Sequence, residues 1–160
     1  MTPPLINITT IQELLKWYEI NLCNAHLIDA RGYRVRFNAD DFVHLIQLKN
    51  NYGQEPRNRR LAIEEIRRGT LKFEVGKFDE QRARELPWAK EIVIRPDKIC
   101  NNWQALGTGK ELYVKDFGRI GHSPSYRVLA CKVRGTVRQV VTLFPRERIG
   151  GRELRAQIWP

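Results

Sequence analysis

The sequence predicts an α+β domain in which N-terminal helices precede a C-terminal antiparallel sheet of about four strands. In the first part of the chain, apolar residues recur mostly every three or four positions, which is typical of amphipathic helices. From residue 111 the apolar residues alternate with polar ones, which is typical of strands. Helices followed by a run of strands favour an α+β fold. The 160 residues are enough for one core and too few for two of ordinary size.

Residues 10 to 37 predict a helix followed by a pair of strands. Thr9 or Thr10 is suited to cap a helix that continues to about residue 23. The apolar stripe of this helix consists of Ile11, Leu14, Leu15, Tyr18 and Leu22. Residues 26–37 predict two short strands around an Arg-Gly turn, and the second strand alternates apolar residues with arginines, so it has a basic outer face.

The middle of the chain predicts further short helices. Asn38 or Asp40 is suited to cap a helix that ends near residue 49. Its buried side consists of Phe42, Leu45, Ile46 and Leu48. The elements expected after it are a turn over 51–57, a charged helix over 58–68 closed by Gly69, a short strand over 70–75, and helices over 79–86 and 87–95.

The alternating part of the sequence predicts strands over 111–117, 126–133 and 137–144. A three-residue turn over 134–136 is favoured between the last two strands, because a two-residue turn would mix charge into the apolar face. The core face then carries Leu129, Cys131, Val133, Val137, Val141 and Leu143. The opposite face carries Tyr126, Lys132, Arg138 and Thr142, with Tyr113, Lys115 and Phe117 of the preceding strand beside them.

Positive charge is concentrated near the C-terminus. The net charge is +10, and residues 119–160 hold nine Lys or Arg and two Glu. Such a patch attracts polyanions, because each neutralised phosphate releases counterions. Cations beside aromatic rings on one sheet face suit RNA, because phosphates pair with the cations and unpaired bases stack on the rings. The alternatives are a solvated basic surface and a basic tail that binds an acidic partner protein.

Composition also argues against several classes of protein, including membrane and secreted proteins. No apolar run approaches the roughly 20 residues of a membrane helix, and no secretion signal is visible, so we expect a cytoplasmic protein and no membrane partner. The three cysteines form no CxxC pair, which favours reduced thiols. No metal-ligand cluster is evident, so no metal or cofactor is expected. The expected organisation is a helix over 1–24, one domain over 25–145 and a basic tail over 146–160 that packs on it.

Three stretches carry a family resemblance: DFVHLIQL (41–48), IRPDKI (94–99) and VRQVVTLFP (137–145). Together they resemble the phage-associated branch of the barnase–EndoU–colicin E5/D–RelE superfamily, a group of small metal-independent ribonuclease domains. The resemblance spans about residues 25–145 and implies a four-stranded antiparallel sheet after the helices. It also implies RNA cleavage by attack of the neighbouring 2′-hydroxyl on phosphorus. A cytoplasmic or prophage-encoded domain is expected, since nothing in the sequence resembles a delivery domain.

The resemblance implies catalytic roles for four residues. His44 is expected to be the general base or acid, because it matches the family's helix motif and histidine titrates near neutral pH. Lys115 and Arg127 are expected to bind the scissile phosphate, although an ion pair with a helix carboxylate explains Arg127 equally well. Thr142 is expected to donate a hydrogen bond to a phosphate oxygen. His44, Lys115 and Thr142 should then line one cleft.

Further residues are expected to bind RNA without reacting. They are Lys132, Arg134, Arg138, Tyr113 and Tyr126, while His26 and His122 are weaker catalytic candidates. Two other functions use the same features. One is a non-catalytic nucleic-acid-binding module, and the other is an interaction domain whose tail binds an acidic partner or inhibitor. The oligomeric state is not predicted.

Overall fold

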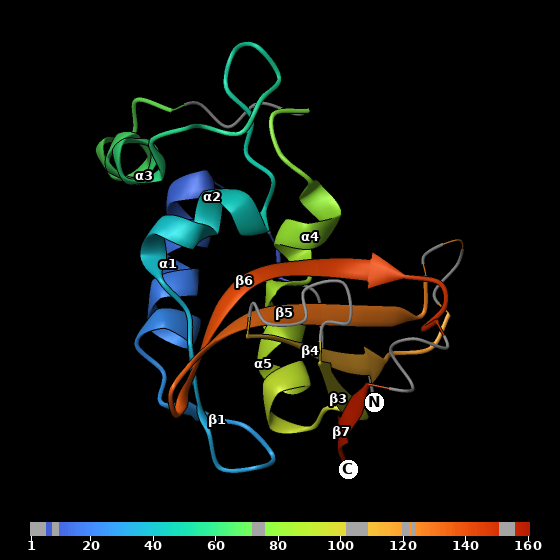
Figure 1. Cartoon of the computed structure of the whole chain (residues 1–160). Coiled ribbons are helices and arrows are strands. Elements are labelled where there is room, and N and C mark those ends of the chain that lie inside the picture. Colours follow the sequence, from blue (N-terminus) through green and yellow to red (C-terminus); the bar gives the residue numbers. More distant parts are fainter. Residues whose placement is uncertain are drawn as a thin grey trace.

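The computed structural model describes residues 6–7, 10–71, 76–101, 109–119, 122, 124–150 and 156–160. Its helices are α1 (Ile11–Tyr18), the π-helical turn η1 (Glu19–Cys23), the 3-10 turn η2 (Ala39–Asp41), α2 (Phe42–Leu45), α3 (Arg59–Arg68), α4 (Glu80–Arg84) and α5 (Leu86–Ile94). Its strands are β1 (Leu27–Ile28), β2 (Arg34–Arg36), β3 (Lys98–Asn101), β4 (Lys110–Asp116), β5 (Tyr126–Arg134), β6 (Val137–Arg146) and β7 (Gln157–Trp159). Figure 1 shows their arrangement.

The strands form one curved sheet in the order β1-β2-β6-β5-β4-β3-β7. All neighbouring strands are antiparallel except β2 and β6, which are parallel. The α+β class is therefore confirmed, but the described residues form a mixed sheet of seven strands where an antiparallel sheet of about four was predicted. The added strands are short, and β1 and β2 come from the N-terminal part of the chain, so their alternation was too brief to show that they join the C-terminal sheet.

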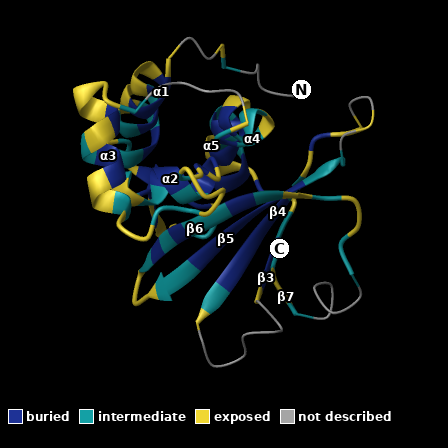
Figure 2. Ribbon diagram, turned by 90° about the horizontal axis from the view of Figure 1, so that it is seen from above, coloured by how far each residue is buried: buried dark blue, intermediate teal, exposed yellow. Residues whose placement is uncertain are grey.

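The helices gather on one side of this sheet (Figure 2). Their apolar side chains and those of the covered sheet face form the main core, which includes Tyr18, Phe42, Trp88, Tyr113 and Leu129. A smaller apolar cluster lies on the opposite sheet face, which we call the outer face, and consists of Leu112, Val114, Val128 and Ala130. No helix among the described residues is long and apolar enough to cross a membrane.

The first helix forms largely as predicted. The side chain of Thr10 accepts a hydrogen bond from the backbone N–H of Glu13, so it caps α1. The predicted apolar stripe is buried, and the helix continues through the π-helical turn to Cys23. Burial raises the pKa of the Cys23 thiol to about 11, which keeps it protonated at neutral pH.

The second predicted helix is shorter than expected. It ends at Leu45 and not near residue 49, because Gln47 has a φ of 52° and the chain turns there. Its four predicted apolar residues are nevertheless buried. The later helices α3, α4 and α5 lie where they were predicted, and Gly69 ends α3 with a φ of 74°. The strand expected over 70–75 lies mostly outside the described residues.

The register of the β5–β6 hairpin differs from the prediction. Arg134 pairs with Val137, so the turn has two residues, and Gly135 takes the positive φ of 60° that such a turn needs. A β-bulge between Ala130 and Cys131 then restores the apolar alternation in the rest of the hairpin. As a result Arg138 and Val140 face the helices, whereas the side chain of Val137 lies on the outer face.

The predicted placement of the preceding strand was also wrong. Tyr113, Lys115 and Phe117 face the helices and not the side that carries Lys132 and Thr142. Phe117 stacks on Trp88 with ring centroids 4.6 Å apart. The bounds of all three predicted strands agree with β4, β5 and β6 to within two residues.

Candidate nucleic-acid interface

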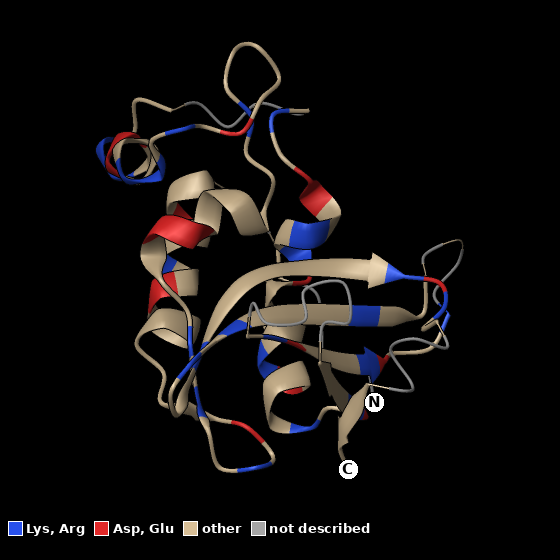
Figure 3. Cartoon of the chain, viewed as in Figure 1, with Lys and Arg blue, Asp and Glu red and all other residues tan. Residues whose placement is uncertain are grey.

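The β5–β6 hairpin has basic residues at both of its ends (Figure 3). Six of the nine residues predicted to act in catalysis or RNA binding lie on these two strands. They do not share one face, however, because the two-residue turn and the bulge divide them between the helix-covered face and the outer face. The position of each side chain therefore follows from its register.

His44 lies in α2, on the helix side of the sheet, and is half-buried. Its Nδ1 is 2.5 Å from Oε2 of Glu55, and the other oxygen of Glu55 is 2.8 Å from Nη2 of Arg59. Arg59 in turn donates to Oδ1 of Asp41 at 2.9 Å. A carboxylate that holds one ring nitrogen fixes the orientation of the imidazole. His44 is thus positioned by a charged network that joins α2 to the start of α3.

Arg127 is buried at the start of β5, where its Nε and Nη2 donate to the carboxylate of Glu85 at 2.7 and 2.8 Å. Its Nη1 donates to the carbonyls of Pro124 and Tyr126. The guanidinium also lies 5.2 Å from the centroid of the Trp88 ring. The ion pair with a carboxylate from the helical region is therefore confirmed, and each guanidinium nitrogen of Arg127 already has a partner in the protein.

Lys115 also faces the helices. Its Nζ donates to the carbonyl of Arg95 at 2.7 Å, just after the end of α5, and lies 3.8 Å from Oδ1 of Asp97. A cation at this position satisfies a carbonyl at the helix C-terminus and favours the helix dipole. The described contacts of Lys115 thus hold α5 against β4.

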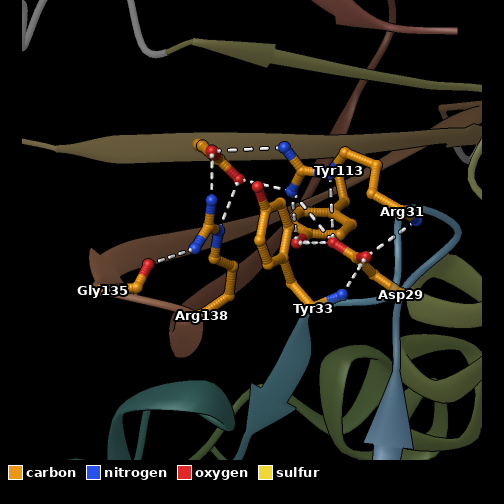
Figure 4. A network of polar contacts seen from close by, with 7 residues as sticks. Asp29, Arg31, Tyr33, Tyr113, Gly135 and Arg138 are labelled. Atoms are coloured by element: carbon orange, nitrogen blue, oxygen red, sulfur yellow. Dashed lines mark hydrogen bonds and ion pairs between the residues drawn. The ribbon is translucent and has the colours of Figure 1, made fainter.

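Tyr113 and Arg138 belong to a buried polar network, which also contains Asp29, Arg31 and Glu111 (Figure 4). Glu111 accepts hydrogen bonds from both arginines, at 2.6 Å from Nη2 of Arg31 and 3.1 Å from Nε of Arg138. Tyr113 donates its hydroxyl to Asp29 at 2.6 Å. Tyr113 and Arg138 were both predicted to bind RNA, but neither is on the surface. Tyr113 is fully buried and Arg138 is 6% exposed.

The network keeps its carboxyl groups ionised. Burial alone would raise the pKa of Glu111, but the hydrogen bonds from Arg31 and Arg138 outweigh it and lower the pKa below the ordinary value. The pKa of Asp29 is lowered in the same way by Tyr113, the backbone of Tyr33 and Arg31. Burial and the contact with Asp29 raise the pKa of the Tyr113 hydroxyl, so it remains a donor.

Thr142, Lys132 and Tyr126 lie on the outer face. Thr142 is opposite Ala130 in the ladder, and Ala130 belongs to the outer apolar cluster, as does the partly buried ring of Tyr126. His44 and Lys115 are on the helix side of the sheet, so the described residues do not place them in one cleft with Thr142. His26 is exposed before β1, and His122 is exposed in the loop before β5.

Five cations lie together on the outer face near the hairpin turn. Arg36 is beside Gln139, Gln139 beside Lys132, and Lys132 beside Lys110 in a row across four strands. The next positions add Arg34 and Arg134, which flank Val137. We call these five residues the cationic strip: Arg34, Arg36, Lys110, Lys132 and Arg134. Within the described part of the chain, none of them forms an ion pair with a carboxylate.

Sequence reasoning selected Lys132 and Arg134 of this strip and missed the other three. The alternation of Arg34 and Arg36 with Val35 did show a basic strand face. What the sequence did not show is that β2 pairs in parallel with β6, which places both arginines beside Gln139 and Lys132. Parallel pairing between segments about 100 residues apart leaves no local signal.

The chain was also compared with known proteins. No family model, no curated protein and no solved structure matches it.

Proposed function

We propose that this protein binds single-stranded RNA on the outer face of its sheet and cleaves it as a metal-independent endoribonuclease. The observation that carries the binding proposal is the cationic strip, whose five cations come from the three strands β2, β4 and β5 and have no carboxylate partner among the described residues. Neighbouring strands are about 4.8 Å apart, so the row from Arg36 to Lys110 spans roughly 14 Å. Unpaired cations at this density favour a polyanionic ligand.

The rest of the outer face supports a single-stranded ligand. Tyr126 and Phe144 are only partly buried there, and each has a π-face on which an unpaired base could stack. Gln139 lies between cations of the strip, and Thr142 lies farther along β6. Their side chains supply hydrogen-bonding groups for sugar or base edges.

The resemblance of the sequence to metal-independent ribonuclease domains supports cleavage. In that reaction the 2′-oxygen bonds to phosphorus, the bond from phosphorus to the 5′-oxygen breaks, and the products are a 2′,3′-cyclic phosphate and a 5′-hydroxyl. A base must accept the 2′-hydroxyl proton, the 5′-oxygen must gain one, and cations must offset the charge on the phosphorane. Arginines and lysines supply the cations without a metal ion.

Removal of the strip charges tests the binding proposal. The triple variant Arg36→Ala, Lys110→Ala, Lys132→Ala is expected to bind a labelled single-stranded RNA about 100-fold more weakly near 0.1 M salt. The reason is that each lost phosphate contact reduces the slope of log K against log salt concentration by about 0.7. Fluorescence anisotropy over a range of salt concentrations measures both quantities. The matched control Lys16→Ala, Arg60→Ala, Lys90→Ala removes the same charge from the helices, where all three residues are exposed. Equal losses in the two variants would show that net charge alone drives binding.

RNA cleavage is tested by incubating the purified protein with RNA in EDTA. We expect cleavage to persist and the fragments to end in 2′,3′-cyclic phosphate. Because His44 lies across the sheet from the strip, His44→Ala is expected to retain most of the activity, in contrast to the roughly 100- to 10,000-fold loss that follows removal of a catalytic base. A loss of that size would place the reaction beside α2. Salt-sensitive binding without any cleavage would instead support a non-catalytic RNA-binding module.

A further inference from the structure

A pocket lies at the other end of the β5–β6 hairpin, where β5 begins and β6 ends. It has a volume of about 220 Å³ and is lined by Arg119, Pro124, Ser125, Glu147 and Arg148. Ile149, which follows the lining residues, packs against the outer apolar cluster. The segment after β6 therefore turns onto the outer face, the same face that carries the cationic strip.

The charged residues of this pocket have no ion-pair partners among the described residues. Arg119, Glu147 and Arg148 are exposed. In contrast to the two pocket arginines, Arg59 and Arg67 on α3 each form an ion pair with a carboxylate. Two guanidinium groups and one carboxylate thus border one hollow. None of their nitrogen–oxygen distances is short enough for an ion pair, that is, 4.0 Å or less. Their combined charge of +1 favours an anionic ligand that also offers a hydrogen-bond donor to Glu147.

We propose that this pocket holds the phosphodiester that is cleaved, with Arg119 and Arg148 on its non-bridging oxygens and Glu147 as the acceptor of the 2′-hydroxyl proton. This assignment rests on the proposed function and adds a reactive site to it. Guanidinium groups suit phosphate because they present paired N–H donors. Pockets for drug-sized ligands usually measure about 300–1,000 Å³, so a smaller hollow fits one phosphate and part of its ribose.

The proposed reaction at this site is an intramolecular displacement at phosphorus. The Glu147 carboxylate takes the 2′-hydroxyl proton while the 2′-oxygen bonds to phosphorus. The bond from phosphorus to the 5′-oxygen breaks, and the 5′-oxygen takes a proton from water. Protonated Glu147 then returns its proton to the solvent. The two arginines and the Ser125 hydroxyl stabilise the added negative charge of the phosphorane.

The pocket and the strip are arranged to bind one RNA strand. β5 begins beside the pocket at Tyr126 and reaches the strip at Lys132, six residues later. A strand rises about 3.4 Å per residue, so the two regions are roughly 20 Å apart along β5. An RNA that follows the outer face of β5 meets both of them and passes Tyr126 and Phe144 on the way.

The first test uses uridine 3′-monophosphate as the probe, because a mononucleotide is too short to reach the strip. Titration calorimetry of the full chain is expected to show binding that falls at least about tenfold in Arg119→Ala and in Arg148→Ala, since each variant removes one charged contact to phosphate. The control Lys16→Ala is expected to bind as the wild type does. Binding that is absent, or that is unchanged in both arginine variants, would refute the phosphate site even if long RNA still binds the strip.

The second test replaces Glu147 by glutamine. In Glu147→Gln, single-turnover cleavage of a short RNA is expected to fall about 100- to 10,000-fold, while RNA affinity stays the same or rises. The control Glu13→Gln, an exposed position on α1, should leave cleavage unchanged. Wild-type activity in Glu147→Gln, or a wild-type protein that binds but does not cleave, would overturn the role of Glu147.

Discussion

Replacing Glu111 by glutamine is expected to lower the free energy of unfolding by about 3–5 kcal/mol, because the change leaves Arg31 and Arg138 without their shared anion. Glu111 is 5% exposed and accepts hydrogen bonds from both guanidinium groups. In the variant, an amide N–H₂ faces these donors and cannot accept from them. Urea denaturation followed by circular dichroism measures the loss.

A double variant separates the charge from the packing in this network. Glu111→Leu with Arg138→Leu removes both partners, and Arg31 keeps its contact with Asp29 at 2.9 Å. We expect this double variant to be more stable than Glu111→Gln, because apolar replacement of a whole buried pair is far less costly than removal of one member. An unfolding free energy for Glu111→Gln within about 1 kcal/mol of the wild type would contradict the assigned role of the network.

The same network predicts a dependence of stability on pH. The pKa values of Glu111 and Asp29 are lower in the folded protein than their ordinary values of 4.5 and 3.8. Each carboxyl therefore stabilises the fold fully above its unfolded pKa, and this contribution is lost as the pH falls through the folded pKa. The acid-induced loss of stability below about pH 4.5 should be smaller in Glu111→Gln, which lacks one of the two groups.

Replacing Arg127 by methionine is expected to cost a similar amount, about 3–5 kcal/mol, because it leaves the Glu85 carboxylate buried without its cation. Glu85 is 2% exposed, and within the described part of the chain its carboxylate also accepts a hydrogen bond from Gln81. Thermal and urea unfolding measure the change. Adding Glu85→Leu to Arg127→Met should recover much of the lost stability, since no unpaired charge is then buried.

This variant also tests the role in phosphate binding that was predicted for Arg127. The guanidinium is held by Glu85 and two carbonyls, so the salt dependence of RNA binding should be the same in the folded fraction of Arg127→Met as in the wild type. A salt slope reduced by about 0.7 would instead show that Arg127 contacts a phosphate.

The parts of the fold that could be predicted from sequence are those set by local patterns. Thr10, Asn58 and Gly69 begin or end helices through contacts within a few residues, and all three signals are visible in the sequence. The alternation of apolar residues likewise gave the bounds of β4, β5 and β6. These features depend on side chains that are close along the chain.

The register of the hairpin could not be predicted from the same rules. The two-residue turn was rejected because it places a charge on the apolar face, and in the structure Arg138 does lie on that face. Its burial is tolerated because Glu111, on a different strand, binds it. The contact between residues that are distant along the chain therefore had more influence on the register than the apolar pattern within the hairpin. Arg138 and Tyr113, which were predicted to lie on an RNA-binding surface, are in the interior.

The short strands at the two ends of the sheet have a consequence for association between molecules. An unpaired strand edge offers a row of N–H and C=O groups to which another chain can add, and natural sheets limit this by making edge strands short. Here β1 has two residues and β7 has three, whereas the inner strands β5 and β6 have nine and ten. β5 is paired on both sides, by β4 and β6, whereas β2 pairs with only three residues of β6, Val137 to Gln139. The two end strands themselves thus offer few unpaired N–H and C=O groups, which disfavours strand addition at β1 and β7.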